Sequence, residues 1–301
     1  MTPLDDAALA RLQSAAMWPT LPGDRYTDLE RIGHGGMGTV YRGWDRVLQR
    51  AVAIKVSNAA IPGADDGLDA RLTDEARVLA ALEHPGIVAI HDAGVLDDGR
   101  AFYVMRLVTG PTLATHRATL SDVSAGLSLI ERIAETIAFA HAHGIAHRDL
   151  SPNNIMIGAF GDVLVLDWGV AHRAAANRDG IRVGTPGFMA PELASGAPSG
   201  PAAEVYSLGA LLAWLLDGFT IDRRLQAIVT RCQAEAPSAR YATVDLLIRD
   251  LAAYRAGTAI TAYRDTWFEQ VGQWARRYQT FLWLVAAYLV MRAALLWYLR
   301  R

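Results

Sequence analysis

Three polar residues of this 301-residue chain could carry out chemistry together. Asp149 and Asn154 follow a helical pattern, so we expect both on the loop after that helix. A carboxylate there can accept the proton of an attacking hydroxyl, and an amide oxygen can bind a metal ion. Asp167 ends an apolar strand pattern and precedes a glycine. It supplies a second oxygen ligand of the kind that Mg²⁺ prefers.

A lysine on a strand gives a second signal. Lys55 ends the apolar run that begins at Val52, and a buried lysine is costly without an anion nearby. A phosphate or Glu75, on a predicted helix over 68–82, could be that anion. The alternative is a strand-edge lysine that is simply solvated.

A glycine-rich stretch precedes the lysine. Gly33, Gly35 and Gly38 would let a hairpin backbone lie against phosphate oxygens, because no Cβ stands in the way. Dinucleotide-binding folds share this spacing but require a helix next. Residues 39–44 continue as a strand pattern instead.

The elements that must position these residues change type along the chain. Strand patterns dominate the first third and helical patterns dominate from about Ser121. Strands followed by helices predict an α+β protein in two lobes. The predicted strands are 26–33, 39–45, 51–57, 87–95 and 101–108, and the main predicted helices are 5–17, 68–82, 121–144, 204–218, 224–236 and 243–257.

Bulk composition excludes some classes. The net charge of −2 gives no electrostatic basis for nucleic-acid binding, so no nucleic-acid partner is expected. The single cysteine, Cys232, excludes an intramolecular disulfide and is expected to be a packed thiol. The N-terminus carries Asp5 and Asp6 where a secretory signal would be basic, which predicts a cytoplasmic catalytic part.

The C-terminal segment is strongly apolar. Residues 281–299 contain a single charge, Arg292, and approach the length of about 20 residues that a bilayer span needs. Trp283 and Trp297 near the two ends resemble interfacial aromatic belts. We expect a single-pass helix that anchors the chain to the inner membrane, preceded by an amphipathic segment over 258–280. The alternative is a hydrophobic helix folded onto the catalytic domain or a partner.

Five motifs occur in a fixed order: the glycine stretch, the strand lysine, the loop 147–154, the turn 167–169 and residues 184–192. Together they resemble a protein kinase, most closely the bacterial eukaryotic-like Ser/Thr kinases, over about residues 26–257. The resemblance implies ATP and Mg²⁺ as cofactors and phosphorylation of protein Ser and Thr hydroxyls.

The resemblance also implies a role for each catalytic residue. Asp149 is the base, Asn154 and Asp167 bind Mg²⁺, and Lys55 holds the α- and β-phosphates while pairing with Glu75. Other implied contacts join Thr185 to the catalytic aspartate and Glu192 to Arg240. The implied nucleotide-binding residues are Gly33, His34, Gly35, Gly36, Met37, Gly38, Val40, Ala53, Lys55, Met105, Arg106, Val108 and Met156, with Met105 as gatekeeper and 106–108 as hinge.

Three residues depart from the family pattern. Ser151 replaces a lysine expected near the γ-phosphate, so slower turnover or dependence on another cation is a hypothesis. Trp168 stands where phenylalanine is usual, as a larger apolar plug beside the helix of Glu75. Glu204 stands where an aspartate normally anchors the catalytic loop.

Two segments depart as well. Residues 170–184 contain no Ser, Thr or Tyr, which excludes phosphorylation at the usual activation-loop position. Asp179 is the hypothetical substitute for that phosphate, as a partner of Arg148. After Gly218 the chain lacks the loop and helix with which the family commonly docks protein substrates.

These patterns predict four regions: a leader and linker (1–25), a kinase domain (26–257, with lobes 26–108 and 109–257), the amphipathic segment (258–280) and the anchor (281–299). The expected partners are protein substrates of unknown identity, the membrane, and a second copy of the chain in a homodimer. A pseudokinase, acting as a nucleotide-binding or scaffolding module, is the alternative function. A small-molecule kinase of the same broad fold is a third, which residues 184–192 disfavour because that loop positions a peptide.

Overall fold

The computed structural model describes residues 18–35, 38–58, 67–168, 172–173, 184–194 and 200–263, with five single positions between 284 and 297. The predicted leader helix, Gly36, Met37, Asp179 and most of the predicted amphipathic and anchor segments lie outside these residues. Within the described residues, no helix has both the length and the apolar character that crossing a membrane requires.

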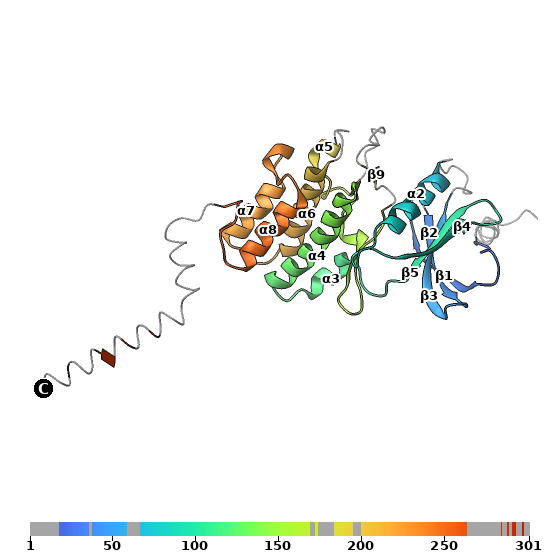
Figure 1. Cartoon of the computed structure of the whole chain (residues 1–301), viewed down its shortest axis with the longest axis horizontal. Helices are drawn as coiled ribbons and strands as arrows, with labels where there is room; N and C mark the ends of the chain where they lie inside the picture. Colours follow the sequence, from blue (N-terminus) through green and yellow to red (C-terminus); the bar gives the residue numbers. More distant parts are fainter. Residues whose placement is uncertain are drawn as a thin grey trace, which may run out of the picture.

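A sheet-containing lobe and a helical lobe lie side by side (Figure 1). The first lobe holds an antiparallel sheet with strand order β1-β2-β3-β5-β4. The predicted two-lobed α+β architecture is therefore confirmed for the described residues. The strands are β1 (Tyr26–His34), β2 (Gly38–Asp45), β3 (Arg50–Ser57), β4 (Ile90–Val95) and β5 (Ala101–Arg106).

The two faces of this sheet have different partners. Because side chains alternate along a strand, β3 sends Val52, Ile54 and Val56 to one face, where they join a core of their own. Ala53 and Lys55 point to the opposite face. There β5 places Met105 opposite Ala53 and Tyr103 opposite Lys55.

Helix α2 (Leu68–Ala81) packs against this second face. Its buried residues include Leu68, Leu72, Glu75 and Leu79, spaced so that they share one side of a helix. Glu75 is 2% exposed, so a carboxylate is carried on the buried side among apolar neighbours. Such a group needs a cation or hydrogen-bond donors nearby.

The second lobe is built around α4 (Val123–Ala142) and α6 (Pro201–Leu216). Eleven of the sixteen residues of α6 are buried, as expected for a helix that is apolar all round. Asp122 caps α4 by accepting a hydrogen bond from the Ala125 amide at 2.8 Å. The other helices are α3 (Leu113–His116), α5 (Pro191–Ala194), α7 (Arg223–Cys232) and α8 (Val244–Arg255).

Short strands at the boundary between the lobes shape the loops that carry the polar motifs. β7 (Ile155–Ile157) pairs with β8 (Val163–Val165), so Asn154 enters one strand and Asp167 follows the other. β6 (Ile145–Ala146), before the loop of Asn154, pairs with β9 (His172–Arg173), after Asp167. Together the two pairings bring the loop of Asn154 close to the segment that carries Asp167.

Candidate active site

A cavity of about 550 Å³ opens between the two lobes. Its wall includes the glycine-rich hairpin, strands β3 and β5, the chain that leaves β5, and the loops around β7 and β8. Of the predicted nucleotide-binding residues, all that the structure describes line it: Gly33, His34, Gly35, Gly38, Val40, Ala53, Lys55, Met105, Arg106, Val108 and Met156. Asp149, Asn154 and Asp167 line it as well.

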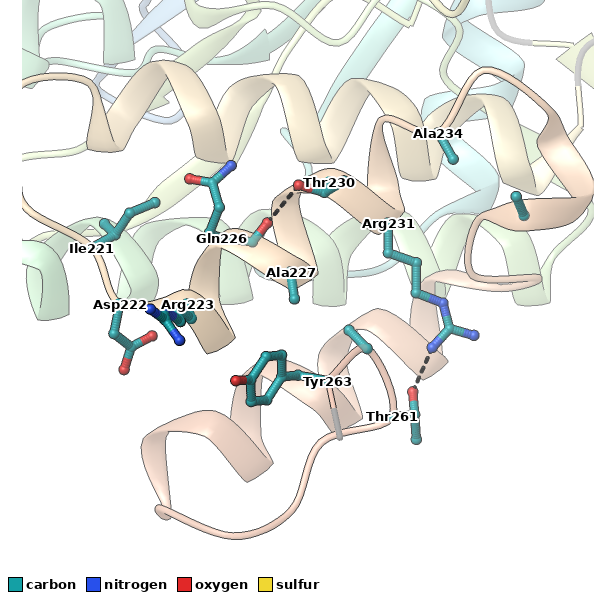
Figure 2. Close-up of a pocket in the computed structure, with 12 residues that line it drawn as sticks. Ile221, Asp222, Arg223, Gln226, Ala227, Thr230, Arg231, Ala234, Thr261 and Tyr263 are labelled. Atoms are coloured by element: carbon teal, nitrogen blue, oxygen red, sulfur yellow. Dashed lines mark hydrogen bonds between the residues drawn. The ribbon is translucent and has the colours of Figure 1, made fainter. Parts of the chain in front are cut away.

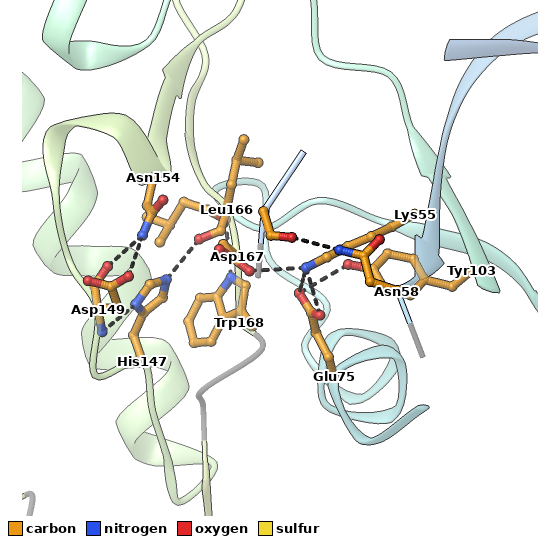
Figure 3. Close-up of polar contacts among 12 residues, drawn as sticks. Lys55, Asn58, Glu75, Tyr103, His147, Asp149, Asn154, Leu166, Asp167 and Trp168 are labelled. Carbon is orange, nitrogen blue, oxygen red and sulfur yellow. Dashed lines mark hydrogen bonds and ion pairs between the residues drawn. The ribbon is translucent and has the colours of Figure 1, made fainter. Parts of the chain in front are cut away.

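Lys55 lies between two carboxylates (Figure 3). Its Nζ is 2.8 Å from Oε2 of Glu75 and 3.0 Å from Oδ1 of Asp167. The hydroxyl of Tyr103 donates to Oε1 of Glu75 at 3.0 Å. Burial disfavours the charge of Lys55, but the neighbouring Tyr103, Glu75 and Asp167 outweigh this and raise its pKa. The lysine is therefore a fixed cation on the cavity wall.

The catalytic-loop carboxylate is held on both sides. Thr185 donates from Oγ1 to Oδ1 of Asp149 at 2.7 Å, and Nδ2 of Asn154 lies 3.1 Å from Oδ2 of the same residue. That amide also donates to the backbone oxygen of Asp149 at 2.8 Å. With Nδ2 engaged in this way, Asn154 has Oδ1 to offer to a metal ion.

Hydrogen-bond directions fix the tautomer of His147. The amide of Asp149 donates to Nδ1 of His147 at 3.2 Å, so Nδ1 accepts. Nε2 must then carry the proton, which it donates to the backbone oxygen of Leu166 at 2.9 Å. A neutral imidazole therefore connects the loop of Asp149 to the strand end that carries Asp167 (Figure 3).

Two non-glycine residues of the site have left-handed backbones. Arg148 has φ of 72° and Asp167 has φ of 58°, a conformation that costs about 1–3 kcal/mol and needs surrounding support. At Arg148 the support is Oε1 of Glu204, which accepts from the Arg148 amide at 2.6 Å. Next to Asp167, the backbone amide of Leu166 donates to the backbone oxygen of Asn154 at 2.7 Å.

The donor set suits a magnesium–nucleotide complex. Asn154 and Asp167 bring an amide oxygen and a carboxylate to the same cavity. Mg²⁺ is commonly held by one or two such protein oxygens, with phosphate oxygens and water completing the shell. When bound there, Mg²⁺ would neutralise charge on the phosphates.

The comparison with known families agrees with this geometry. Residues 26–243 match the family described as protein kinase domain. The chain belongs to the protein kinase family.

Three bacterial proteins are among the curated relatives of this kinase domain. The serine/threonine-protein kinase PknD of Chlamydia pneumoniae is 31% identical over 295 residues, covering 78% of this chain and 31% of the relative. PknL of Mycobacterium tuberculosis strain H37Rv is 36% identical over 224 residues, covering 71% and 55%. The DNA damage-responsive serine/threonine-protein kinase RqkA of Deinococcus radiodurans is 37% identical over 205 residues, covering 64% and 30%. The kinase chain thus spans about a third to a half of these relatives.

The kinase domain accommodates its unusual Trp168. The indole is fully buried, donates from Nε1 to the backbone oxygen of Val165 at 3.1 Å, and meets the ring of His147 edge-on at 4.7 Å between centroids. It belongs to the same core as Leu79 of α2. The larger ring is compatible with an α2 position in which Glu75 reaches Lys55.

Glu204 contacts the catalytic loop directly. Besides the Arg148 amide, it meets His141, whose Nε2 lies 2.5 Å from Oε2. Burial of Glu204 opposes its charge, but the hydrogen bonds from His141 and the Arg148 amide outweigh burial and lower its pKa. The extra methylene relative to aspartate thus still lets the carboxylate use both oxygens.

Other departures are also visible. Ser151 is buried and is absent from the described residues that line the cavity. Residues 217–222 alone connect α6 to α7, as expected from the shortened sequence after Gly218. The implied pair of Glu192 and Arg240 is present, with two contacts of 2.6 and 2.8 Å.

A second hollow lies away from these motifs, along α7 (Figure 2). It is shallow, has a volume of about 830 Å³, and is bounded by α7 and residues 261–263. Arg231 donates to Oγ1 of Thr261 at 2.8 Å across one end. Its described lining residues include none of the predicted catalytic or nucleotide-binding residues, so the smaller cavity between the lobes is the candidate active site.

Sequence reasoning missed several members of the site. Tyr103, which contacts Glu75, and the cavity residues Leu79 and Val165 were not predicted. A signal for Tyr103 was available: it lies two residues before Met105 on the same strand, so both side chains face the same side.

Proposed function

We propose that the chain is an ATP- and Mg²⁺-dependent protein kinase that phosphorylates Ser and Thr hydroxyls of proteins. The observation that carries the proposal is that Lys55 and Asp149 line the same cavity. Lys55 is paired with Glu75 and supplies positive charge for the phosphates. Asp149 is held by Thr185 and Asn154 and supplies a base. The family match and the printed names of the relatives support the same reaction class.

The reaction divides the work among these residues. Asp149 accepts the proton of the substrate hydroxyl as its oxygen attacks the γ-phosphorus, and the bond from that phosphorus to the β-phosphate oxygen breaks, releasing ADP. Lys55 neutralises charge on the α- and β-phosphates. Thr185 and Asn154 orient the carboxylate of Asp149. Little covalent help is required, because alignment and charge neutralisation supply most of the rate gain.

Serine and threonine are the proposed acceptors because Thr185 contacts the base, as the family resemblance implies for Ser/Thr kinases. Incubation of the 301-residue chain with γ-labelled ATP, Mg²⁺ and a generic basic protein tests this. Label on phosphoserine and phosphothreonine, lost when Mg²⁺ is chelated, is the expected result. Nucleotide binding without transfer would instead indicate the pseudokinase, and label on phosphotyrosine would contradict the acceptor class.

We further propose the regional organisation expected from the sequence: a kinase domain over 26–257 in the cytoplasm, and residues 281–299 as an anchor in the inner membrane. The near absence of charge over 281–299 supports the anchor. Fractionation of cells that express the chain, with and without residues 281–299, tests it. Recovery of both forms in the same fraction would contradict the anchor.

Protein substrates and a second copy of the chain are the proposed partners. Light scattering on the purified chain distinguishes a homodimer from a monomer.

A further inference from the structure

A buried polar side chain contacts the backbone of the glycine-rich hairpin from outside the cavity. Asn58 follows β3 directly and is 7% exposed. Figure 3 shows its side chain with one of its hydrogen bonds. Neither Asn58 nor Thr39, its neighbour on β2, occurs among the described residues that line the cavity. Any effect of these two on a nucleotide must therefore pass through other residues.

The hydrogen bonds of Asn58 have only one consistent set of directions. Its Nδ2 donates to the backbone oxygen of Gly35 at 2.8 Å, because a carbonyl can only accept. Oδ1 of the same amide therefore faces Thr39, whose hydroxyl must donate its proton to it at 2.9 Å. Having given its proton away, Thr39 can only accept from Nδ1 of His34, 2.9 Å away. His34 is thus fixed with its proton on Nδ1 when neutral.

This chain of hydrogen bonds ends on the residues that face the cavity. Both His34 and Gly35 line it. Gly35 is held at two points, since its amide also donates to the Gly38 oxygen at 2.9 Å. Gly38 in turn lies so close to β3 that a Cβ on it would be 2.6 Å from the Val56 oxygen. The two described ends of the hairpin are therefore tied to the end of β3.

We propose that Asn58 is a positioning residue for ATP: through Thr39 and the Gly35 carbonyl, it holds Gly35 and Gly38, the two described ends of the glycine-rich hairpin, in place at the cavity wall. This inference rests on the proposed ATP-dependent activity and extends it to residues outside the cavity. A hairpin that is ordered before ATP arrives loses less conformational entropy on binding. If only a fraction of molecules holds the competent conformation, the apparent affinity falls by that fraction.

Three variants separate the parts of this network. Asn58→Leu removes the hydrogen bonds to Gly35 and Thr39 but keeps a side chain of similar size. Thr39→Val keeps the β-branched shape but removes the relay between Asn58 and His34. Asn58→Asp keeps an acceptor for Thr39 but sets a carboxylate oxygen against the Gly35 carbonyl. Tyr26→Phe is the matched control, because it removes a 2.9 Å hydrogen bond to Asp92 at the other end of β1.

The measurements are the Kd for Mg²⁺–ATP by calorimetry, the KM for ATP and kcat, and amide hydrogen exchange of the peptide containing Gly35 without nucleotide. Loss of a buried hydrogen bond is commonly worth about 0.5–1.5 kcal/mol, and two are removed in Asn58→Leu. We therefore expect Kd and KM to rise about 5- to 150-fold in Asn58→Leu and at least as much in Asn58→Asp. Thr39→Val should cause a smaller rise, and kcat should change much less than KM.

The exchange measurement distinguishes positioning from a general loss of stability. Asn58→Leu should speed exchange at Gly35 while leaving α4 unchanged, and Tyr26→Phe should alter neither Gly35 exchange nor Kd. Parent values of Kd and KM in both Asn58→Leu and Thr39→Val would overturn the inference. If Asn58→Leu does not fold, Thr39→Val decides.

Failure of the proposed function gives a different pattern. A parent chain that binds ATP but transfers no phosphate would contradict the kinase activity, while the Kd and exchange comparisons would still decide the role of Asn58. A parent chain that does not bind ATP would overturn both.

Discussion

Nζ of Lys55 lies 2.8 Å from Oε2 of Glu75, although the lysine belongs to β3 and the glutamate to α2. Both side chains are almost fully buried. Tyr103 completes the arrangement from β5 with its hydrogen bond to Glu75. The charge that the cavity presents to phosphates thus depends on how a helix is seated on a sheet.

Removing that charge should greatly reduce activity. Lys55→Met is expected to lower kcat/KM for ATP by about 100-fold or more, as found when a preorganised electrostatic group is lost. Glu75→Gln should lower it less, since Lys55 keeps Asp167 as a partner at 3.0 Å. Steady-state kinetics check both. Asp74→Asn, which breaks an exposed pair with Arg77 on the same helix, is the control and should retain parent activity. Parent-like activity in Lys55→Met would contradict the assignment.

Restoring a cation at position 151 should speed the reaction. Ser151→Lys would return a positive charge that the family resemblance implies near the γ-phosphate, and we expect kcat to rise on the order of 10-fold. Ser151→Met has similar length without charge and controls for packing at this buried position. Equal effects of the two substitutions on kcat would show that the charge is not what the site lacks.

The ion pair of Arg25 and Asp45 should make stability depend on pH in the acidic range. Hydrogen bonds from Arg25, with help from the amides of Leu48 and Val47, lower the pKa of Asp45 to about 2. The unfolded value is about 3.9, so this stabilisation is complete above pH 4 and is lost as the pH falls toward 2.

Asp45→Asn should therefore be less stable than the parent at pH 7, with a difference that shrinks below pH 4. Urea denaturation at several pH values measures it. Asp97→Asn, on an exposed turn, controls for the loss of one negative charge. A difference that stays constant from pH 7 to pH 3 would refute the role of the carboxylate.

The single cysteine should be inert in the folded protein. Burial raises the pKa of Cys232 to about 12, and its side chain packs where α7 meets Gly209 of α6. At pH 8 only about 1 thiol in 10,000 would be ionised, and the thiolate is the reactive form. Ellman's reagent should detect no thiol in the native chain and one in urea. Rapid reaction of the native protein would contradict this packing.

The sequence predicted much of this architecture because its signals are local. Strands β2 and β3 and helix α2 were predicted within a few residues, since apolar spacing and turn residues mark them. The predicted nucleotide-binding and catalytic residues that line the cavity were identified from the order of the motifs, which specifies both the type and the position of a residue. The burial of Cys232 was also expected.

What could not be predicted depends on contacts between distant residues. The hydrogen bond of Tyr103 to Glu75 depends on the register between β5 and β3 and on the position of α2 against the sheet. The connection of Asn58 to Gly35 needs the end of β3 to meet a hairpin 23 residues earlier. Neither residue belongs to a motif, and each would read alone as an ordinary strand or turn residue.

The most direct test of the central claim is the rate of phosphate transfer by Asp149→Asn at saturating Mg²⁺ and ATP. Asparagine has nearly the same shape but cannot take the proton, while ATP binding through Lys55 should survive. We predict a Kd for ATP within about threefold of the parent and a transfer rate reduced about 100-fold or more, the usual scale of general base catalysis. Transfer at the parent rate would contradict the account, because the base would then lie elsewhere.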